Sequence, residues 1–220
     1  MNRRHVRWIT ALAALITCRA PASPSGLALI PTADLVPDKE FVAELQLDGS
    51  AEHFDTDTRF INLEIGLADR IEAGVDYDAS TETEEPWLFN AKLLAAKTEA
   101  GTALLAVGFR NLGAEGEPEG YAVATCGCGD LRGHFGCTCS EERNLDGIIG
   151  FDYEWCDGWW LYGEWTSGPE NAGAAGVNVP LPGPFDLMTG VVIPNRPADD
   201  VTYSLHLVCG APCPTLFAKD

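Results

Sequence analysis

Residues 144–167, NLDGIIGFDYEWCDGWWLYGEWTS, decide the fold class. From Leu145 to Trp155 every second residue is apolar, aromatic or glycine, and most residues between them are acidic or small. This period of two is typical of a β-strand whose two faces meet different surroundings. Cys156-Asp157-Gly158 then predicts a tight turn, because glycine tolerates the positive φ of hairpin turns. A second alternating strand, from Trp159 to Thr166, completes a predicted hairpin.

The same alternation recurs along most of the chain and predicts about twelve strands. In chain order we expect them at 41–48, 58–67, 71–78, 87–97, 102–112, 121–128, 131–139, 145–155, 159–166, 172–179, 185–193 and 201–208. Beyond residue 22 no segment approaches the roughly 20 apolar residues of a membrane-spanning helix. The sequence therefore predicts an all-β protein.

The connections between these strands alternate between long and short. The longer ones carry most of the excess acid, in the runs DTDT, STETEEP, GAEGEPEG, SEER, PENA and PADD. An up-and-down sheet places alternate connections at opposite ends, and bacterial outer-membrane barrels have short periplasmic turns and longer external loops. We therefore expect a single antiparallel up-and-down transmembrane β-barrel of about twelve strands, with both termini on the periplasmic side.

The ends of the chain divide it into four parts. Residues 1–22 predict a secretory signal peptide, with a basic start at Arg3, Arg4 and Arg7 and an apolar run before Ala20-Pro21-Ala22. Cys18 leaves a lipoprotein signal as the lesser alternative. Residues 23–40 form an irregular segment, residues 41–208 the barrel, and residues 209–220 a C-terminal tail.

Charge excludes one class of partner. Without residues 1–22, ten Lys and Arg remain against 33 Asp and Glu, a net charge of −23. Such a surface repels nucleic acid, whose binding depends on basic contacts to phosphate. No nucleic-acid partner is expected.

The alternative fold is a soluble secreted β-sandwich acting as an adhesion or ligand-binding module. A sandwich holds tryptophan mainly in its core, whereas membrane barrels carry aromatic girdles at both interfaces. The five tryptophans after residue 22 all fall at or near the ends of predicted strands: Trp87, Trp155, Trp159, Trp160 and Trp165. Their placement favours the barrel.

Three stretches carry a family resemblance: IPTADLVPDKE, INLEIGLADRIEAGVDYD and LDGIIGFDYEWCDGWWLYGEW. The pattern, which extends over most of residues 26–208, resembles bacterial outer-membrane barrels of the YjbH type. The resemblance implies an outer-membrane barrel linked to exopolysaccharide production or export. The function we expect is therefore non-enzymatic, as a narrow pore or a scaffold. It implies outer-membrane lipid, and polysaccharide or export machinery, as partners.

Four cysteines cluster in CGCGDLRGHFGCTC and share one predicted strand face: Cys126, Cys128, Cys137 and Cys139. A turn at Arg132-Gly133 would pair them across two strands, whereas a turn at Gly129-Asp130 would offset them. Disulfides of an oxidising compartment, unpaired apolar thiols on the lipid face, and a four-cysteine metal site remain open.

The predicted inner face gives little sign of catalysis. Ser204 and His206 share that face, but two residues along a strand are about 7 Å apart, which predicts no direct hydrogen bond. No catalytic residue, cofactor or metal is expected, although a lipid hydrolase remains a distant alternative.

The lumen is predicted to be acidic. Its expected acids are Glu72, Asp76, Asp152, Glu154 and Glu164, balanced in part by Lys92, Arg110 and Arg132. Inward bulk at Phe60, Trp160, Tyr162 and Met188 predicts a constricted lumen, and its acids predict weak cation selectivity if it conducts.

Overall fold

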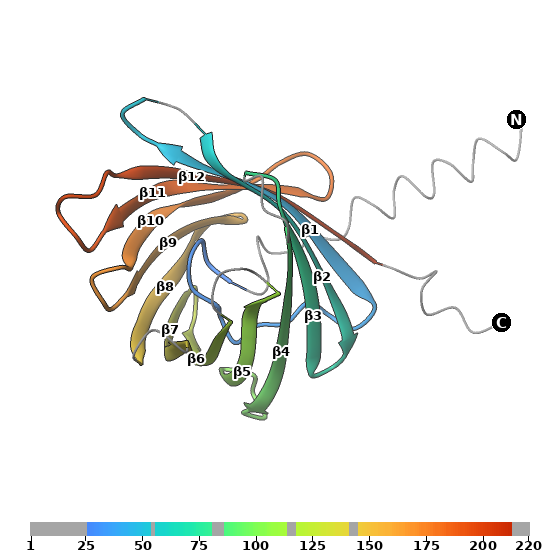
Figure 1. Cartoon of the computed structure of the whole chain (residues 1–220). Coiled ribbons are helices and arrows are strands. Elements are labelled where there is room, and N and C mark those ends of the chain that lie inside the picture. Colours follow the sequence, from blue (N-terminus) through green and yellow to red (C-terminus); the bar gives the residue numbers. More distant parts are fainter. Residues whose placement is uncertain (1–25, 54–55, 81–85, 114–117, 141–144, 213–220) are drawn as a thin grey trace, which may run out of the picture.

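A computed structural model describes residues 26–53, 56–80, 86–113, 118–140 and 145–212. Twelve strands account for most of these residues (Figure 1). They are β1 (Glu40–Ser50), β2 (Thr56–Ala68), β3 (Ile71–Asp78), β4 (Trp87–Lys97), β5 (Ala103–Leu112), β6 (Glu119–Cys128), β7 (Leu131–Ser140), β8 (Asp146–Cys156), β9 (Trp159–Thr166), β10 (Ala172–Pro180), β11 (Phe185–Pro194) and β12 (Thr202–Pro212).

Each strand pairs antiparallel with its neighbours in the sequence, and β1 pairs with β12 to close the barrel. Glu40 lies opposite Pro212, so the two ends of the wall meet at the rim that carries the short turns. Closure leaves no open sheet edge, which lipid could not satisfy. The predicted all-β, up-and-down, twelve-strand barrel is confirmed, and the sandwich alternative is wrong.

The outer face of the wall is apolar. Side chains such as Ile61, Phe89, Ile149 and Ile193 are more than half exposed. Soluble monomers rarely expose so continuous an apolar surface. Their strand neighbours point inward because successive side chains alternate between the faces of a strand.

Tryptophans lie at both rims of this outer face. Trp155 and Trp159 flank the two-residue turn between β8 and β9, while Trp87 and Trp165 lie at the opposite rim. Trp160 differs, since it points into the lumen, where the Arg132 guanidinium lies 5.4 Å from its ring centre. No helix among the described residues is long and apolar enough to cross a membrane.

The barrel extends slightly beyond its predicted limits of 41 and 208. β12 continues to Pro212 because Gly210, Ala211 and Pro212 pair with the first residues of β1. Most other strands match their predicted ranges within one or two residues, and β3 and β4 match at both ends.

Disulfides, one of the three alternatives left open for the cysteine cluster, are not formed in the structure. The turn falls at Gly129-Asp130, so Cys126 lies opposite Gly133 and Cys137 opposite Ala122. Cys126 and Cys137 are thus four positions apart along the strands, roughly 13 Å, well beyond the ~7 Å Cα separation that a disulfide spans. All four cysteines are unpaired on the outer face, with Cys137 the most buried of them. Among the described residues no group of three or more His, Cys, Asp or Glu is placed to hold a metal ion.

Candidate functional site

The lumen is occupied by residues 26–38 of the same chain, which we term the plug. In Figure 1 this blue segment lies inside the ring of strands before the chain enters β1. Leu27 N–H donates to the Ile30 carbonyl, which closes a tight loop at its start. Ile30, Ala33 and Val36 are each no more than 2% exposed.

Apolar side chains of the plug pack into three clusters on the inner wall. Ile30 and Ala33 join Ala106, Val123 and Ile148. Val36 packs with Val42 and Val208, and Leu27 and Leu29 border a third cluster around Tyr162 and Met188. Burial of this apolar surface stabilises the plug at roughly 25 cal/mol per Å² removed from water.

Glu164 binds the plug through its backbone. Its two carboxylate oxygens accept hydrogen bonds from the N–H groups of Leu29 (3.0 Å) and Ile30 (2.9 Å). The side chain is 7% exposed. A buried carboxylate requires such donors, and a buried irregular backbone requires acceptors for its N–H groups, so each group satisfies the other.

Other wall residues bind further along the plug. Glu72 accepts a hydrogen bond from Val36 N–H at 2.7 Å. In the opposite sense, Arg110 donates to the Leu29 carbonyl at 2.8 Å and Lys92 to the Asp34 carbonyl at 2.9 Å. Acidic and basic side chains of the wall therefore both hydrogen-bond to the plug backbone. In a lumen filled only with water, these side chains would hydrogen-bond to water instead.

A closed chain of hydrogen bonds begins and ends on two adjacent plug residues. Ala33 N–H donates to Thr125 Oγ1, and the Thr125 hydroxyl contacts His134 Nδ1 at 2.9 Å. His134 Nε2 contacts Asp152 at 3.0 Å. Asp152 binds Arg132, and Arg132 binds Asp34 of the plug at 2.9 Å. The chain joins β6, β7 and β8 to the plug.

Two wall glycines make room for the plug. A Cβ on Gly150 would lie 2.7 Å from Ile30 Cδ1, and a Cβ on Gly66 would collide with the carbonyl oxygens of Val36 and Pro37. Gly66 also accepts a hydrogen bond from Lys39 N–H, where the plug leads into β1. Any larger residue at these positions meets the plug before it meets solvent.

The predicted inward acids all lie on the inner face or at its rim, but in different roles. Glu72 and Glu164 bind the plug, and Asp152 binds Arg132 and His134. Asp76 accepts a hydrogen bond from the Asn90 amide at 2.6 Å. Glu154 accepts one from Gly158 N–H in the short turn, away from the plug.

The expectation that Ser204 and His206 are too far apart was wrong. Ser204 Oγ lies 2.7 Å from His206 Nε2, because both side chains lean along β12 and close the gap between their Cα atoms. His206 Nδ1 lies 3.0 Å from Glu44, a Ser–His–Glu arrangement.

This arrangement does not form a nucleophile. The Ser204 hydroxyl donates to Asp48 at 2.6 Å, so its proton is directed at that carboxylate and not at His206 Nε2. Ser204 is also only 1% exposed. The group ties β12 to β1 across the seam at which the barrel closes.

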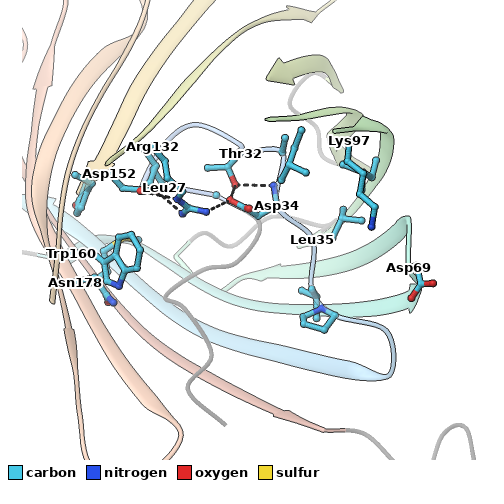
Figure 2. A pocket seen from close by; sticks show the side chains of 18 of the residues that line it. Leu27, Thr32, Asp34, Leu35, Asp69, Lys97, Arg132, Asp152, Trp160 and Asn178 are labelled. Carbon is cyan, nitrogen blue, oxygen red and sulfur yellow. Dashed lines mark hydrogen bonds and ion pairs between the residues drawn. The ribbon is translucent and has the colours of Figure 1, made fainter. Parts of the chain in front are cut away.

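Two cavities flank the plug. One, of about 620 Å³, lies on the long-loop side and is lined by Glu64, Asp76, Arg110 and Glu170 among others. The other, of about 540 Å³, lies on the short-turn side (Figure 2). Residues 26–31 line the first and residues 26–27 and 32–38 line the second, so the plug lies between two vestibules.

The plug was not predicted, since residues 23–40 were expected only as an irregular segment without a location. One signal was present: Leu27, Leu29, Ile30 and Val36 are apolar but lie outside any alternating strand, and so require burial elsewhere. Thr125, an inward residue that binds the plug, carried no sequence signal.

Two solved structures share the architecture. The chain is similar to a KdgM porin, with a TM-score of 0.55 and 10% sequence identity over 76% of this chain and 98% of the other. It is also similar to a KdgM porin in complex with disordered oligogalacturonate, with a TM-score of 0.52 and 10% identity over 77% of this chain and 98% of the other. No protein-family model and no curated protein matches the sequence. At this identity the likeness establishes the barrel fold alone.

Proposed function

We propose that this protein is a non-enzymatic porin-like barrel of the bacterial outer membrane, whose lumen is closed at rest by its own plug. The observation that carries the proposal is the pairing of an apolar outer face with a lumen in which residues 26–38 are bound between two cavities. Lipid accounts for the outer face, and N-terminal export accounts for delivery to that membrane. The plug accounts for the burial of Glu72 and Glu164, whose carboxylates accept hydrogen bonds from its backbone.

The finer part of the proposal is a role in exopolysaccharide production or export. Its support is the resemblance of the sequence to YjbH-type barrels. Solutes would pass only after the plug moves, because residues 26–38 lie between the two vestibules. Without such movement the barrel serves as a scaffold for polysaccharide machinery in the same membrane.

Planar-bilayer recording of the refolded protein tests the closed lumen. We expect few or no openings from the chain that begins at residue 23 and frequent openings from a truncation that begins at Pro37. The truncation keeps all twelve strands, since the plug precedes β1. Equal conductance from both proteins would contradict the plug as the barrier, whereas silence from both would leave the scaffold role.

Location needs its own measurement. We expect the protein to sediment with outer membrane and to migrate differently on gels before and after boiling. Recovery from the soluble periplasm would contradict the proposal whatever the bilayer recordings show.

A further inference from the structure

The cavity on the short-turn side of the plug has the features of a binding site. It encloses about 540 Å³, a volume typical of small-molecule sites. One wall belongs to the plug, through residues 32–38, and the facing wall belongs to the barrel. Lys97, at the end of β4, and Asp69, in the turn between β2 and β3, are the lining residues at the short-turn rim (Figure 2).

Its surface is mostly apolar. Leu27 and Leu35 of the plug face Leu94, Leu104 and Met188 of the wall. Trp160 adds a flat aromatic surface, and Figure 2 shows it beside Asn178. Such a lining favours an apolar or aromatic molecule.

The charged groups around Arg132 in the lining are already paired with one another. Arg132 binds Asp34 at 2.9 Å and Asp152 at 2.6 Å, so it lies between two carboxylates. A ligand anion would approach those carboxylates, and a ligand cation would approach the guanidinium above Trp160. The lining as a whole holds four carboxylates against two cations, so it disfavours an anion, and the pairing of Arg132 leaves no free charge for a ligand at the centre of the lining.

One polar group in the lining lacks a partner. Asn178 is 4% exposed, and its Oδ1 has no hydrogen-bond partner among the described residues. The hydroxyl of Tyr162, another lining residue, also lacks a hydrogen-bond partner among the described residues. A buried acceptor without a donor is unfavourable, so a ligand N–H or O–H would be stabilised at Asn178 Oδ1 once this amide, which neighbouring atoms now cover, turns toward the ligand.

We propose that this cavity binds a small, uncharged, mainly apolar molecule with one hydrogen-bond donor, such as an aromatic amine, a phenol or a fatty alcohol. The apolar body lies against Trp160 and the leucines, and the donor binds Asn178 Oδ1. Because the plug forms one wall, an occupied cavity also holds the plug in place. The proposal depends on the plugged barrel but not on conductance or on polysaccharide.

Two fluorescent probes with one skeleton test the site. N-phenyl-1-naphthylamine is uncharged and has one N–H, and 8-anilinonaphthalene-1-sulfonate adds a sulfonate to the same rings. Full-length mature protein in vesicles is titrated with each, and signal from protein-free vesicles is subtracted. We expect saturable binding of the neutral probe and binding of the sulfonate at least tenfold weaker.

Variants assign the binding to the cavity. Asn178→Leu removes the acceptor at similar size and should weaken the neutral probe about tenfold, the effect of one lost hydrogen bond. Met188→Trp fills the cavity and should abolish binding. If Met188→Trp does not fold, Leu104→Phe fills the cavity from another strand and serves as the second test. Phe185→Leu, on the outer face, is the control and should bind like the wild type.

The outcomes separate cleanly. Saturable binding that Asn178→Leu and both filling variants leave unchanged would overturn the site, as would no saturable signal above protein-free vesicles. Equal affinity for the sulfonate would overturn the preference for an uncharged ligand.

Discussion

The two faces of the barrel wall are built by different rules. On β8, Phe151 points outward and is 47% exposed, while its neighbour Asp152 points inward and is 3% exposed. The outer face has to match only the apolar character of its surroundings, so any apolar side chain is suitable there. Each residue of the inner face has to match an individual partner, because a buried charge needs a specific donor or counter-charge. The outer face can be predicted from the alternation of residues alone, whereas the inner face depends on a segment that is distant in the sequence.

A charge introduced on the outer face should destabilise the barrel more than any change on the inner face. Phe151→Arg places a guanidinium near mid-strand, and we expect it to cost about 2–4 kcal/mol if that face meets hydrocarbon. Urea unfolding of the protein in lipid vesicles measures the change.

Depth provides the control for this variant. Leu145→Arg, at the long-loop rim, should cost only about 0–1 kcal/mol, as expected near an interface. Phe151→Leu separates the loss of the ring, which packs on Gly163, from the added charge. Equal costs for the two arginines would show that no thickness of hydrocarbon surrounds the barrel.

Removal of one inner charge should loosen the plug while the wall remains intact. Glu164→Gln keeps the shape but places an amide NH₂ against one of the two plug N–H groups. We expect the amides of Leu29 and Ile30 to exchange with deuterium about 10- to 100-fold faster, which corresponds to roughly 1.4–2.8 kcal/mol.

Glu154→Gln is the matched control, since Glu154 binds a turn N–H instead of the plug. It should leave exchange of the plug unchanged. If both variants behave like the wild type, Glu164 does not hold the plug.

A methyl group at a wall glycine should have a smaller effect. Gly66→Ala places a Cβ against the carbonyl oxygens of Val36 and Pro37, and we expect a cost of about 1–2 kcal/mol from overpacking. Gly120→Ala is the control, because its Cβ would meet one backbone oxygen at 3.8 Å. Equal stabilities of the two variants in vesicles would contradict close contact between the plug and β2.

The cysteines sharpen the description of the outer face. We expect Cys126, Cys128, Cys137 and Cys139 to be free thiols, because the register offsets them. Mass spectrometry after alkylation without reductant should find all four modified once the barrel is unfolded. A peptide that links Cys126 to Cys137 would contradict the register of β6 and β7.

The strands of the barrel wall could be predicted from the sequence because strand alternation is a local pattern. For Ile71–Asp78 and Trp87–Lys97 both boundaries were predicted correctly from this pattern alone. It also placed Glu72, Asp152 and Glu164 on the inner face, because parity assigns every residue of a strand to one side.

The partners of those residues could not be predicted. The bond from Glu164 to Leu29 joins residues 135 positions apart, and the plug has no period that would reveal its location. Ser204 and His206 show a different limit: spacing between Cα atoms did not anticipate that two side chains can lean toward each other and meet at 2.7 Å. Turn position was similarly open, and with it the arrangement of the cysteines.

Ion selectivity is the smallest expected effect, and it needs the open barrel. In the truncation that begins at Pro37, Lys92 still faces Glu72 and Arg132 still faces Asp152. Asp76 and Glu164 have N–H groups, not cations, as their hydrogen-bond partners, and truncation removes those of Glu164. We therefore expect weak cation selectivity, on the order of a few-fold, from the excess of inward acid. Reversal potentials in a salt gradient measure it. Glu164→Gln in the truncated protein should lower the selectivity more than Glu154→Gln at the rim, and anion-selective currents would refute the electrostatic argument.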